Sequence, residues 1–284
     1  MPFDSPHFKD IIRYYDKTRF DYRVAWDNSE FPAQHFGMYE EGVDNHKDAL
    51  QNTNRILADI ARVEAGNRVL DAGCGKGGSS LWLTQNRQAQ TVGITLAKSQ
   101  LKDCRAKAKL LGLEEHCEFM IADYCQTPFE SASFDVVWAC ESQCYALNKA
   151  DFYREAYRLL KPGGRLVVAD YIRNDRPLGE EEEKILHRWL KGWAIKDIDT
   201  AAEHQDHAQK AGFDQLNIAD YTPQTWVSLR NLYNNSRSWI WVSRLMLIFG
   251  LRTRVQHQNQ LSSIDQFIAL KSNLWKYVII SAEK

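Results

Sequence analysis

"RVLDAGCGKGGSS" (residues 68–80) reads as a buried strand, a glycine-rich turn and the start of a helix. Its glycines at 73, 75, 77 and 78 formally satisfy the G-x-G-x-x-G pattern of dinucleotide sites. Asp71, however, stands two residues before the first glycine, where the strand should end. The ligand of this turn must therefore suit a close glycine backbone and a carboxylate at the same place.

Short apolar runs alternate with helical patterns from about residue 50 onward. Runs that predict further strands are "QTVGIT" (90–95), "CEFMIAD" (117–123), "FDVVWAC" (134–140), "RLVVADYI" (165–172) and "LWKYVIIS" (274–281). Repeated β–α units predict an α/β fold, a doubly wound and mostly parallel sheet with helices on both faces. Ligands of such sheets bind beyond the carboxyl ends of the strands. We therefore expect Asp71, Thr95, Asp123 and Glu141, which each follow a strand, to line one common rim.

The pattern divides the chain into four parts. Residues 1–49 are rich in aromatic side chains and predict an N-terminal helical lid. Residues 50–174 hold the alternating units of a Rossmann-like binding core. Residues 175–262 are mostly helical and predict a cap over the rim, which makes them the expected substrate compartment. Residues 263–284 should return the chain to the core sheet.

Composition excludes several classes of protein. The chain has 284 residues and a net charge of −1, which argues against a nucleic-acid partner. Its six cysteines form no C-x-x-C pair, and the N-terminus lacks the apolar stretch of a signal peptide, so we expect a cytoplasmic protein. His204 and His207 have a spacing that could hold a metal, but a polar helix surface explains them as well, and we predict no metal site.

The ligand that fits the glycine turn best is a cation. A bound NAD would need an acidic residue about 20 positions after the turn, and Thr95 stands there instead. Asp71 would also repel the phosphates of a dinucleotide. S-adenosylmethionine carries an ammonium and a sulfonium, so the same carboxylate attracts it.

Five segments together carry a resemblance to a known family. In order they are "VLDAGCGKGG", "GITLAKSQ", "IADYCQTPF", "FDVVWACES" and "LLKPGGRLVVAD", and they cover roughly residues 60 to 172. They resemble the successive motifs of class I S-adenosylmethionine-dependent methyltransferases. The chain is most similar to the branch that holds sterol, tocopherol and prenyl-diphosphate C-methyltransferases and the cyclopropane fatty acid synthases. The resemblance implies a seven-stranded sheet and S-adenosylmethionine as cofactor.

The resemblance also implies roles for individual residues. Asp71 would orient the amino-acid end of the cofactor, Gln100 would reach the ribose hydroxyls, and Asp123 would accept from the adenine amino group with Tyr124 beside the ring. The full expected set of cofactor-binding residues is Asp71, Ala72, Gly73, Gly75, Thr95, Leu96, Gln100, Ala122, Asp123, Tyr124 and Cys140.

The candidate catalytic residues are Glu141, Tyr15, His35 and Tyr145. Glu141 follows the fourth strand, so we interpret it as a general base or as a carboxylate that stabilises a carbocation. The alternative is a helix-start acid that pairs with backbone amides. By resemblance to the cyclopropane synthases, "YYDKT" and "QHFGMY" place Tyr15 and His35 near the sulfonium or the acceptor. Tyr145 fits an active-site wall or the core.

The tryptophans and arginines of residues 175–262 indicate what kind of acceptor the protein binds. Five of the nine tryptophans lie between residues 175 and 262, at 189, 193, 226, 239 and 241, and as a set they suggest a large apolar ligand. The segment 237–254 combines aromatic side chains with four arginines. It could be a cap helix packed on the core, a region of transient contact with a membrane surface, or a clamp for a diphosphate.

We therefore expect a methyltransferase that acts on a small, largely apolar natural product, most plausibly at a carbon of an isoprenoid-like acceptor. The alternatives left open are N- or O-methylation of an alkaloid or polyketide, cyclopropanation of acyl chains, a nicotinamide-dependent oxidoreductase and a catalytically silent binding module. Ser142, where the cyclopropane synthases have a histidine, weakens the case for cyclopropanation. The oligomeric state is open, a homo-oligomer included.

Overall fold

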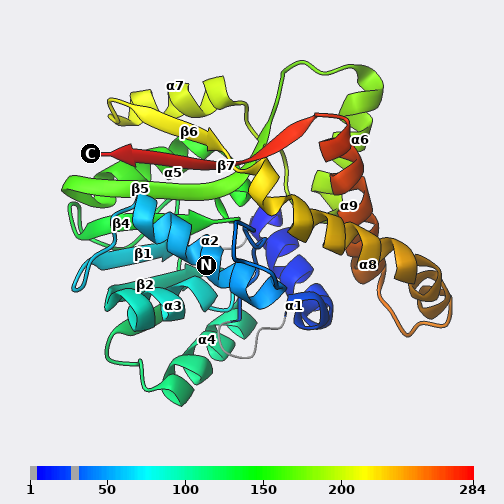
Figure 1. The fold of residues 1–284 in the computed structure, drawn as a ribbon, viewed down its shortest axis with the longest axis horizontal. Coiled ribbons are helices and arrows are strands. Elements are labelled where there is room, and N and C mark those ends of the chain that lie inside the picture. Colours follow the sequence, from blue (N-terminus) through cyan, green and yellow to red (C-terminus); the bar gives the residue numbers. More distant parts are fainter. Residues whose placement is uncertain (1–4, 27–31) are drawn as a thin grey trace.

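The computed structural model describes residues 5–26 and 32–284, and a seven-stranded sheet forms its centre (Figure 1). The strands are β1 (Arg68–Ala72), β2 (Gln90–Thr95), β3 (Cys117–Ile121), β4 (Phe134–Cys140), β5 (Leu160–Arg173), β6 (Leu216–Asp220) and β7 (Trp275–Glu283). Their order is β3-β2-β1-β4-β5-β7-β6. The first five run parallel, and β7 is antiparallel to both of its neighbours. The predicted α/β sheet, mostly parallel and seven-stranded, is confirmed.

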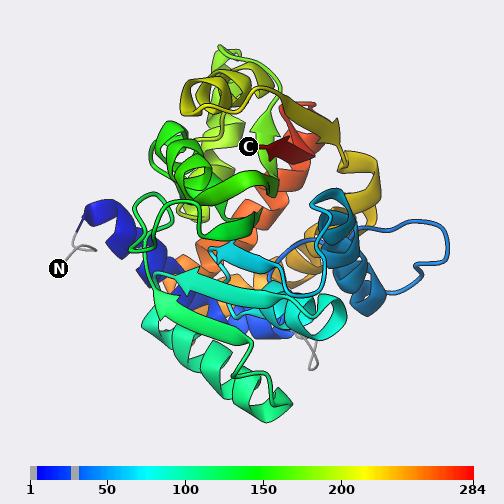
Figure 2. The ribbon, with the colours of Figure 1, turned by 90° about the vertical axis from the view of Figure 1, so that its left-hand side faces the viewer.

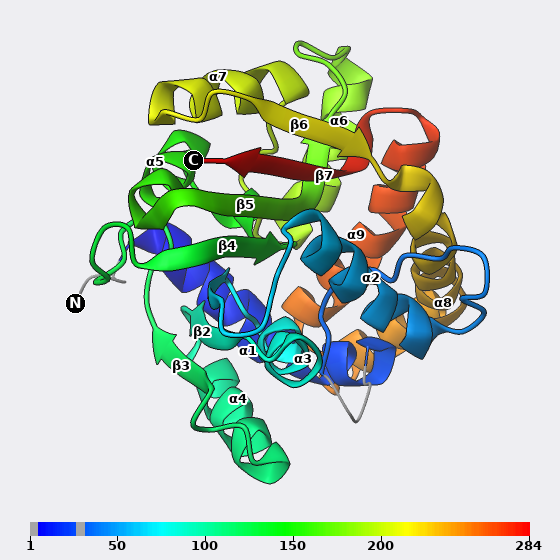
Figure 3. The same cartoon turned by 60° about the vertical axis from the view of Figure 1, so that its left-hand side comes forward.

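Helices cover both faces of this sheet. They are α1 (Pro6–Trp26), α2 (His46–Ile60), α3 (Gly78–Arg87), α4 (Lys98–Leu111), α5 (Lys149–Leu159), α6 (Glu180–Gly192), α7 (Ala201–Ala211), α8 (Thr222–Ile248) and α9 (Arg254–Lys271). In Figure 2, α2 (blue) and α5 (green) lie on opposite sides of the strands. Figure 3 shows α7 beside β6 at one edge of the sheet and α4 beside β3 at the other.

Side chains along each strand point alternately to the two faces of the sheet, and a hydrophobic core lies on each face. In β1, Val69 belongs to the cluster that includes α2 and α3, whereas Leu70 and Ala72 belong to the cluster that includes α5. Successive side chains of a strand point to opposite faces, so a strand covered on both faces must be apolar throughout. This is why "RVLDA" reads as a continuous apolar run around Asp71.

The helices α6, α8 and α9 gather beyond the carboxyl ends of β1, β4 and β5, with α1 beside them (Figure 1). The helices α6 and α8 both pack on α9, and α9 in turn contacts α1. Part of the predicted cap lies in the core instead, because residues 201–220 form α7 and β6. The strand β6 was not predicted. Among the described residues, no helix is long and apolar enough to cross a membrane.

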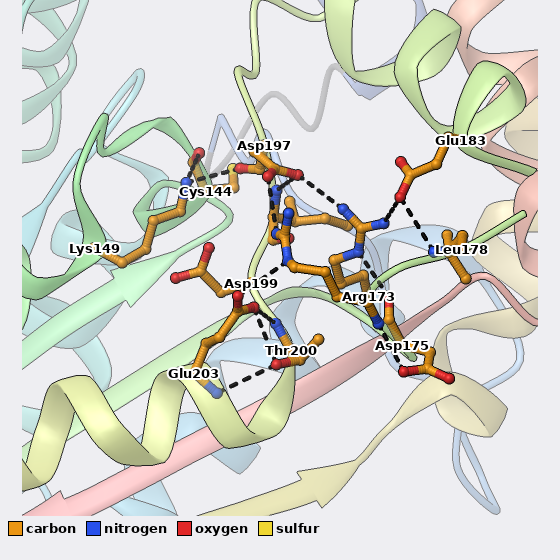
Figure 4. A network of polar contacts seen from close by, with 12 residues as sticks. Cys144, Lys149, Arg173, Asp175, Leu178, Glu183, Asp197, Asp199, Thr200 and Glu203 are labelled. Atoms are coloured by element: carbon orange, nitrogen blue, oxygen red, sulfur yellow. Dashed lines mark hydrogen bonds and ion pairs between the residues drawn. The ribbon is translucent and has the colours of Figure 1, made fainter. Parts of the chain in front are cut away.

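Arg173 at the end of β5 ties the cap to the core (Figure 4). Its guanidinium is buried and contacts Glu183 of α6, and it also contacts Asp197 at 3.3 Å. Its Nε donates to the carbonyl of Asp175 at 2.9 Å. Because one side chain joins the sheet to α6 and to the segment before α7, it fixes where the cap sits on the rim.

Candidate active site

Three cavities meet at the carboxyl ends of β1, β2 and β4. We call them the Gln100 cavity, of about 50 Å³, the Asp71 cavity, of about 30 Å³, and the apolar cavity, of about 410 Å³. Tyr15 of α1 borders all three, and Glu141 borders the second and the third. These two predicted residues therefore lie where the three spaces join.

The Gln100 cavity brings together most of the residues expected to hold a nucleoside. Its lining includes Gly73, Gly75, Thr95, Leu96, Gln100, Ala122 and Tyr124, together with Tyr15 and Tyr145. Gln100 Oε1 accepts from the Thr95 hydroxyl at 2.7 Å, and its Nε2 donates to Gln34 at 3.3 Å. The Gln100 amide is thus buried and held by protein partners at the end of β2.

Gly73 needs both its conformation and its lack of a side chain. Its φ is +95°, and an added Cβ would lie 2.5 Å from the Cβ of Ser142. The Ser142 hydroxyl donates to the Ala72 carbonyl at 2.5 Å, so the turn after β1 packs directly on the turn after β4. Glycine is therefore required here so that the two turns can pack together, and Gly73 borders both the Gln100 and the Asp71 cavities.

Two of the expected cofactor residues, Ala72 and Asp123, border none of the three cavities. Ala72 is buried and contributes its carbonyl to Ser142. The Oδ1 of Asp123 accepts from the amide of Cys125 at 2.8 Å. Burial raises the pKa of Asp123. Its neighbours in the chain, Ala122 and Tyr124, are the residues of this turn that face the Gln100 cavity.

The Asp71 cavity is acidic. Asp71, Cys140 and Glu141 line it together with His35. Asp71 is buried and accepts from the Ser80 hydroxyl at 2.5 Å, and burial raises its pKa to about 6. Burial lowers the pKa of His35 to about 4, so this ring is neutral at neutral pH. Among the described lining residues there is no lysine or arginine, and the space favours a cation.

Glu141 is held by three donors from three segments. Its Oε1 accepts from the backbone amide of Phe36 at 2.6 Å and from the Tyr277 hydroxyl at 2.9 Å. Its Oε2 accepts from the Tyr171 hydroxyl. Burial raises the pKa of Glu141 to about 8, although these hydrogen bonds oppose the shift. Glu141 therefore exchanges its proton near neutral pH, as a general base must.

The other predicted catalytic residues lie beside Glu141 in different ways. Tyr15 and Tyr145 contact each other with ring centroids 5.8 Å apart, and both face the apolar cavity. Burial raises the pKa of both phenols well above the usual range, so they stay protonated. His35 borders only the Asp71 cavity, and its Nδ1 lies 3.1 Å from the carbonyl of Phe36.

The apolar cavity lies between α1, α8, α9 and the ends of β4 and β5. Of the five cap tryptophans, Trp193 and Trp239 line it, Trp189 is buried in the core, and Trp226 and Trp241 lie outside its lining. Its full lining is Tyr15, Phe20, Asp21, Tyr22, Gln34, Phe36, Glu141, Tyr145, Tyr171, Trp193, Leu232, Asn235, Ser236, Trp239, Val242, Ser243, Met246, Arg252, Asn259, Gln260 and Ser263.

One end of the apolar cavity is polar but electrically balanced. Arg252 forms an ion pair with Asp21 at 2.9 Å, and both side chains are largely buried. Asn259 donates to the same Asp21 oxygen at 3.3 Å. Of the four arginines in segment 237–254, Arg252 is the one that lines the cavity.

Several residues of the site escaped the sequence analysis. Gln34, Phe36, Tyr171 and Tyr277 all contact Glu141 or Gln100, yet they come from remote segments. Gln34 and Phe36 lie in the "QHFGMY" segment and Tyr277 in a predicted strand, but none of these signals pointed to Glu141 or Gln100. Tyr171 left the clearest signal. It belongs to a predicted strand, it shares a face with Val167 and Ala169, and in the parallel register Ala169 lies opposite Cys140.

Comparison with known proteins agrees with this geometry. A family model described as a methyltransferase domain matches residues 70–168. The chain is 29% identical to 24-methylenesterol C-methyltransferase 2 of Arabidopsis thaliana over 217 residues, which is 76% of this chain and 58% of that protein. It thus spans little more than half the length of that plant relative.

Two solved structures share the fold. The structure of the [4+2]-cyclase SpnF has a TM-score of 0.79 and 21% identity, and the match covers 96% of this chain and 95% of that one. Geranyl diphosphate C-methyltransferase from Streptomyces coelicolor A3(2), in complex with Mg²⁺, geranyl diphosphate and S-adenosyl-L-homocysteine, has a TM-score of 0.76 and 20% identity over 99% of this chain and 98% of that one. Together these findings show that residues 70–168, which include the glycine turn, match a methyltransferase domain, and that the chain shares its fold with these two structures.

Proposed function

We propose that the protein transfers a methyl group from S-adenosylmethionine to a carbon atom of a small, uncharged, largely apolar acceptor of isoprenoid type. The observation that carries the proposal is the position of Glu141. Its side chain borders both the acidic Asp71 cavity and the apolar cavity. One carboxylate would therefore lie between the methyl donor in the first cavity and the methyl acceptor in the second.

The residues around the glycine turn suit the cofactor. Asp71 and Glu141 would face its two positive groups in a space whose described lining holds no lysine or arginine. Gly73 and Gly75 would let the nucleoside approach the backbone, and the buried Gln100 amide lies at the end of β2, where the ribose is expected. When bound, S-adenosylmethionine supplies an electrophilic methyl group.

The apolar cavity favours an acceptor without a diphosphate. Arg252 lines the cavity, but Asp21 already neutralises it. Arg237 and Arg244 instead lie against Tyr233 and Trp241. A neutral ligand with a hydroxyl or carbonyl would hydrogen-bond at the Asn259 end, and its apolar body would pack on Trp193 and Trp239.

Methylation at carbon requires the acceptor to lose a proton, and Glu141 could accept it. When an alkene carbon takes the methyl group, a carbon–carbon bond would form as the sulfur–methyl bond breaks, and the positive charge would pass from the sulfonium, now a neutral thioether, to the acceptor. The ionised Glu141 carboxylate stabilises that charge and then accepts a proton from the neighbouring carbon, which restores the double bond. The aromatic faces of Tyr171 and Trp193 flank the same space. An amine acceptor would need orientation only.

The experiment is a transfer assay with methyl-labelled cofactor and product analysis, on a panel of prenols, sterols, tocopherol-type quinols, prenyl diphosphates and amines. We expect a carbon-methylated product from a neutral acceptor. Glu141→Gln should lower kcat by about 100-fold or more and weaken S-adenosylmethionine binding, measured by calorimetry, by much less, because Asp71 remains in the cofactor space. Glu130→Gln, on the surface, is the matched control. Products methylated at nitrogen or oxygen, or unchanged turnover of the Gln variant, would contradict the proposal. The cytoplasmic location and the oligomeric state stay predictions.

A further inference from the structure

The outer half of α8 exposes large apolar side chains to the outside. Trp241, Leu245 and Ile248 lie at helical spacing on one face and are 70%, 55% and 69% exposed. Phe249 and Leu251 continue this surface past the helix end, with 74% and 73% exposed. We call residues 237–251 the α8 surface. Figure 1 shows this part of α8 at the edge of the molecule farthest from the amino end of the sheet strands.

The opposite face of the same segment lines the apolar cavity. Ser236 and Ser243 are buried there, while Trp239, Val242 and Met246 line the cavity and remain partly exposed. A helix that is apolar on both sides is normally buried on both. Trp239 and Val242 line the cavity and are still 63% and 41% exposed, so apolar side chains lie at its mouth.

The charged side chains between residues 221 and 264 are all positive. From Tyr221 to Ile264 the sequence contains Arg230, Arg237, Arg244, Arg252 and Arg254 and no aspartate or glutamate. Arg237 and Arg244 fall on the same face of α8 as Trp241, and the guanidinium of Arg244 lies 5.9 Å from the Trp241 ring centroid. Tryptophan and arginine next to exposed leucine and isoleucine are the side chains that suit the boundary between lipid headgroups and acyl chains.

We propose that the α8 surface docks on an anionic lipid bilayer, with the mouth of the apolar cavity facing the lipid. The apolar side chains would enter the upper acyl region, and Arg237 and Arg244 would remain among the headgroup phosphates. A lipophilic acceptor dissolved in the bilayer could then reach Trp239 and enter the cavity without crossing water.

A second copy of the chain fits this surface less well. In a two-fold symmetric dimer the same patch meets itself, which would bring the arginines of both copies together with no carboxylate from this segment between them. Anionic headgroups supply the missing charge.

The test is co-sedimentation of the full chain with large vesicles of phosphatidylcholine alone or with one-third phosphatidylglycerol. We expect binding to the anionic vesicles that weakens with salt. Arg237→Gln with Arg244→Gln should weaken it by roughly 25-fold, from about fivefold for each arginine. Trp241→Ser with Phe249→Ser and Leu251→Ser should weaken it by at least about tenfold.

Matched controls come from exposed side chains elsewhere on the chain. Leu110 and Leu147 are 75% and 68% exposed, so Leu110→Ser with Leu147→Ser removes exposed apolar side chains away from α8. We expect this variant to bind vesicles as the wild type does. If both serine variants bind equally, or if the wild type ignores vesicles and forms a dimer that the α8 variant abolishes, the proposal is wrong.

Brominated acyl chains test the position of the cavity mouth. In Trp241→Phe protein bound to such vesicles, we expect the remaining tryptophan fluorescence to fall, because Trp239 lies at the mouth. Vesicle binding without quenching would overturn the entry route. None of these measurements depends on methyl transfer, so they can fail or succeed independently of the proposed reaction.

Discussion

Glu141 has a backbone conformation that non-glycine residues rarely adopt, with φ at +51°. Its amide donates to the Ala169 carbonyl of β5 at 2.8 Å, and its side chain is fixed by Phe36, Tyr171 and Tyr277. Strain of this kind persists only where the surroundings hold it, and it concentrates at functional sites. The carboxylate is therefore placed before any ligand arrives.

The hydroxyl of Tyr171 should set the pH dependence of the reaction. Burial raises the pKa of Glu141 to about 8, and the Tyr171 hydrogen bond lowers it because it stabilises the ionised form. We expect wild-type kcat/KM, which reports the free enzyme, to rise with pH with a midpoint near 8. In Tyr171→Phe the donor is lost, so the midpoint should move upward by about one pH unit.

The matched control is Tyr153→Phe, since Tyr153 is equally buried but its hydroxyl bonds to His204 on the other face of the sheet. Its pH profile should match the wild type. A Tyr171→Phe profile with an unchanged midpoint would show that Glu141 does not carry the proton.

Residues close to a motif were predictable, and their partners were not. Asp71, Gly73 and Glu141 could be read from the sequence because each stands at a strand end that its own neighbours define. Gln34 and Tyr277 could not, because they reach the site from segments whose placement depends on the packing of the lid and the last strand.

Among the elements, α6 depends most on one side chain, Arg173. Arg173→Met should lower the free energy of unfolding by about 2 kcal/mol, because the buried guanidinium loses its hydrogen bonds to Asp175, Glu183 and Asp197, although the two carboxylates are themselves partly exposed. Urea unfolding measures this. Arg176→Met is the control: Arg176 also pairs with Asp197, but it is partly exposed, and we expect a loss below about 1 kcal/mol. Equal losses in both variants would contradict this account of the cap.

The strand β6 shows where pattern reading fails at the scale of elements. "LNIAD" is five residues long, and only Leu216 in it is buried. It is an edge strand, so its outward side chains need no apolar character, and its pairing with β7 is made by the backbone. Each of the five parallel strands buries at least two side chains, so its sequence is more apolar than that of β6, and this made the strands predictable.

At the scale of the whole molecule, α1 covers the Gln100 cavity, where we propose that the cofactor binds. Ile11, Ile12 and Tyr15 form one wall of the Gln100 cavity, whose volume of about 50 Å³ lies below the roughly 300 Å³ at which ligand pockets begin. We therefore expect α1, which forms one wall of this space, to shift when a nucleoside binds. We expect hydrogen exchange of the α1 amides to slow when S-adenosylmethionine is added, while α5, on the other face, stays unchanged. Identical exchange of α1 with and without the cofactor would contradict this.

The position of β7 has a consequence for biosynthesis. This strand lies between β5 and β6 and is the only partner of β6 in the described sheet. It is also the last described strand to leave the ribosome. Until it emerges, β5 has an open edge and β6 has nothing to pair with, so the nascent polypeptide must wait with a half-built sheet, and chaperones that shield open strand edges would matter most in that interval.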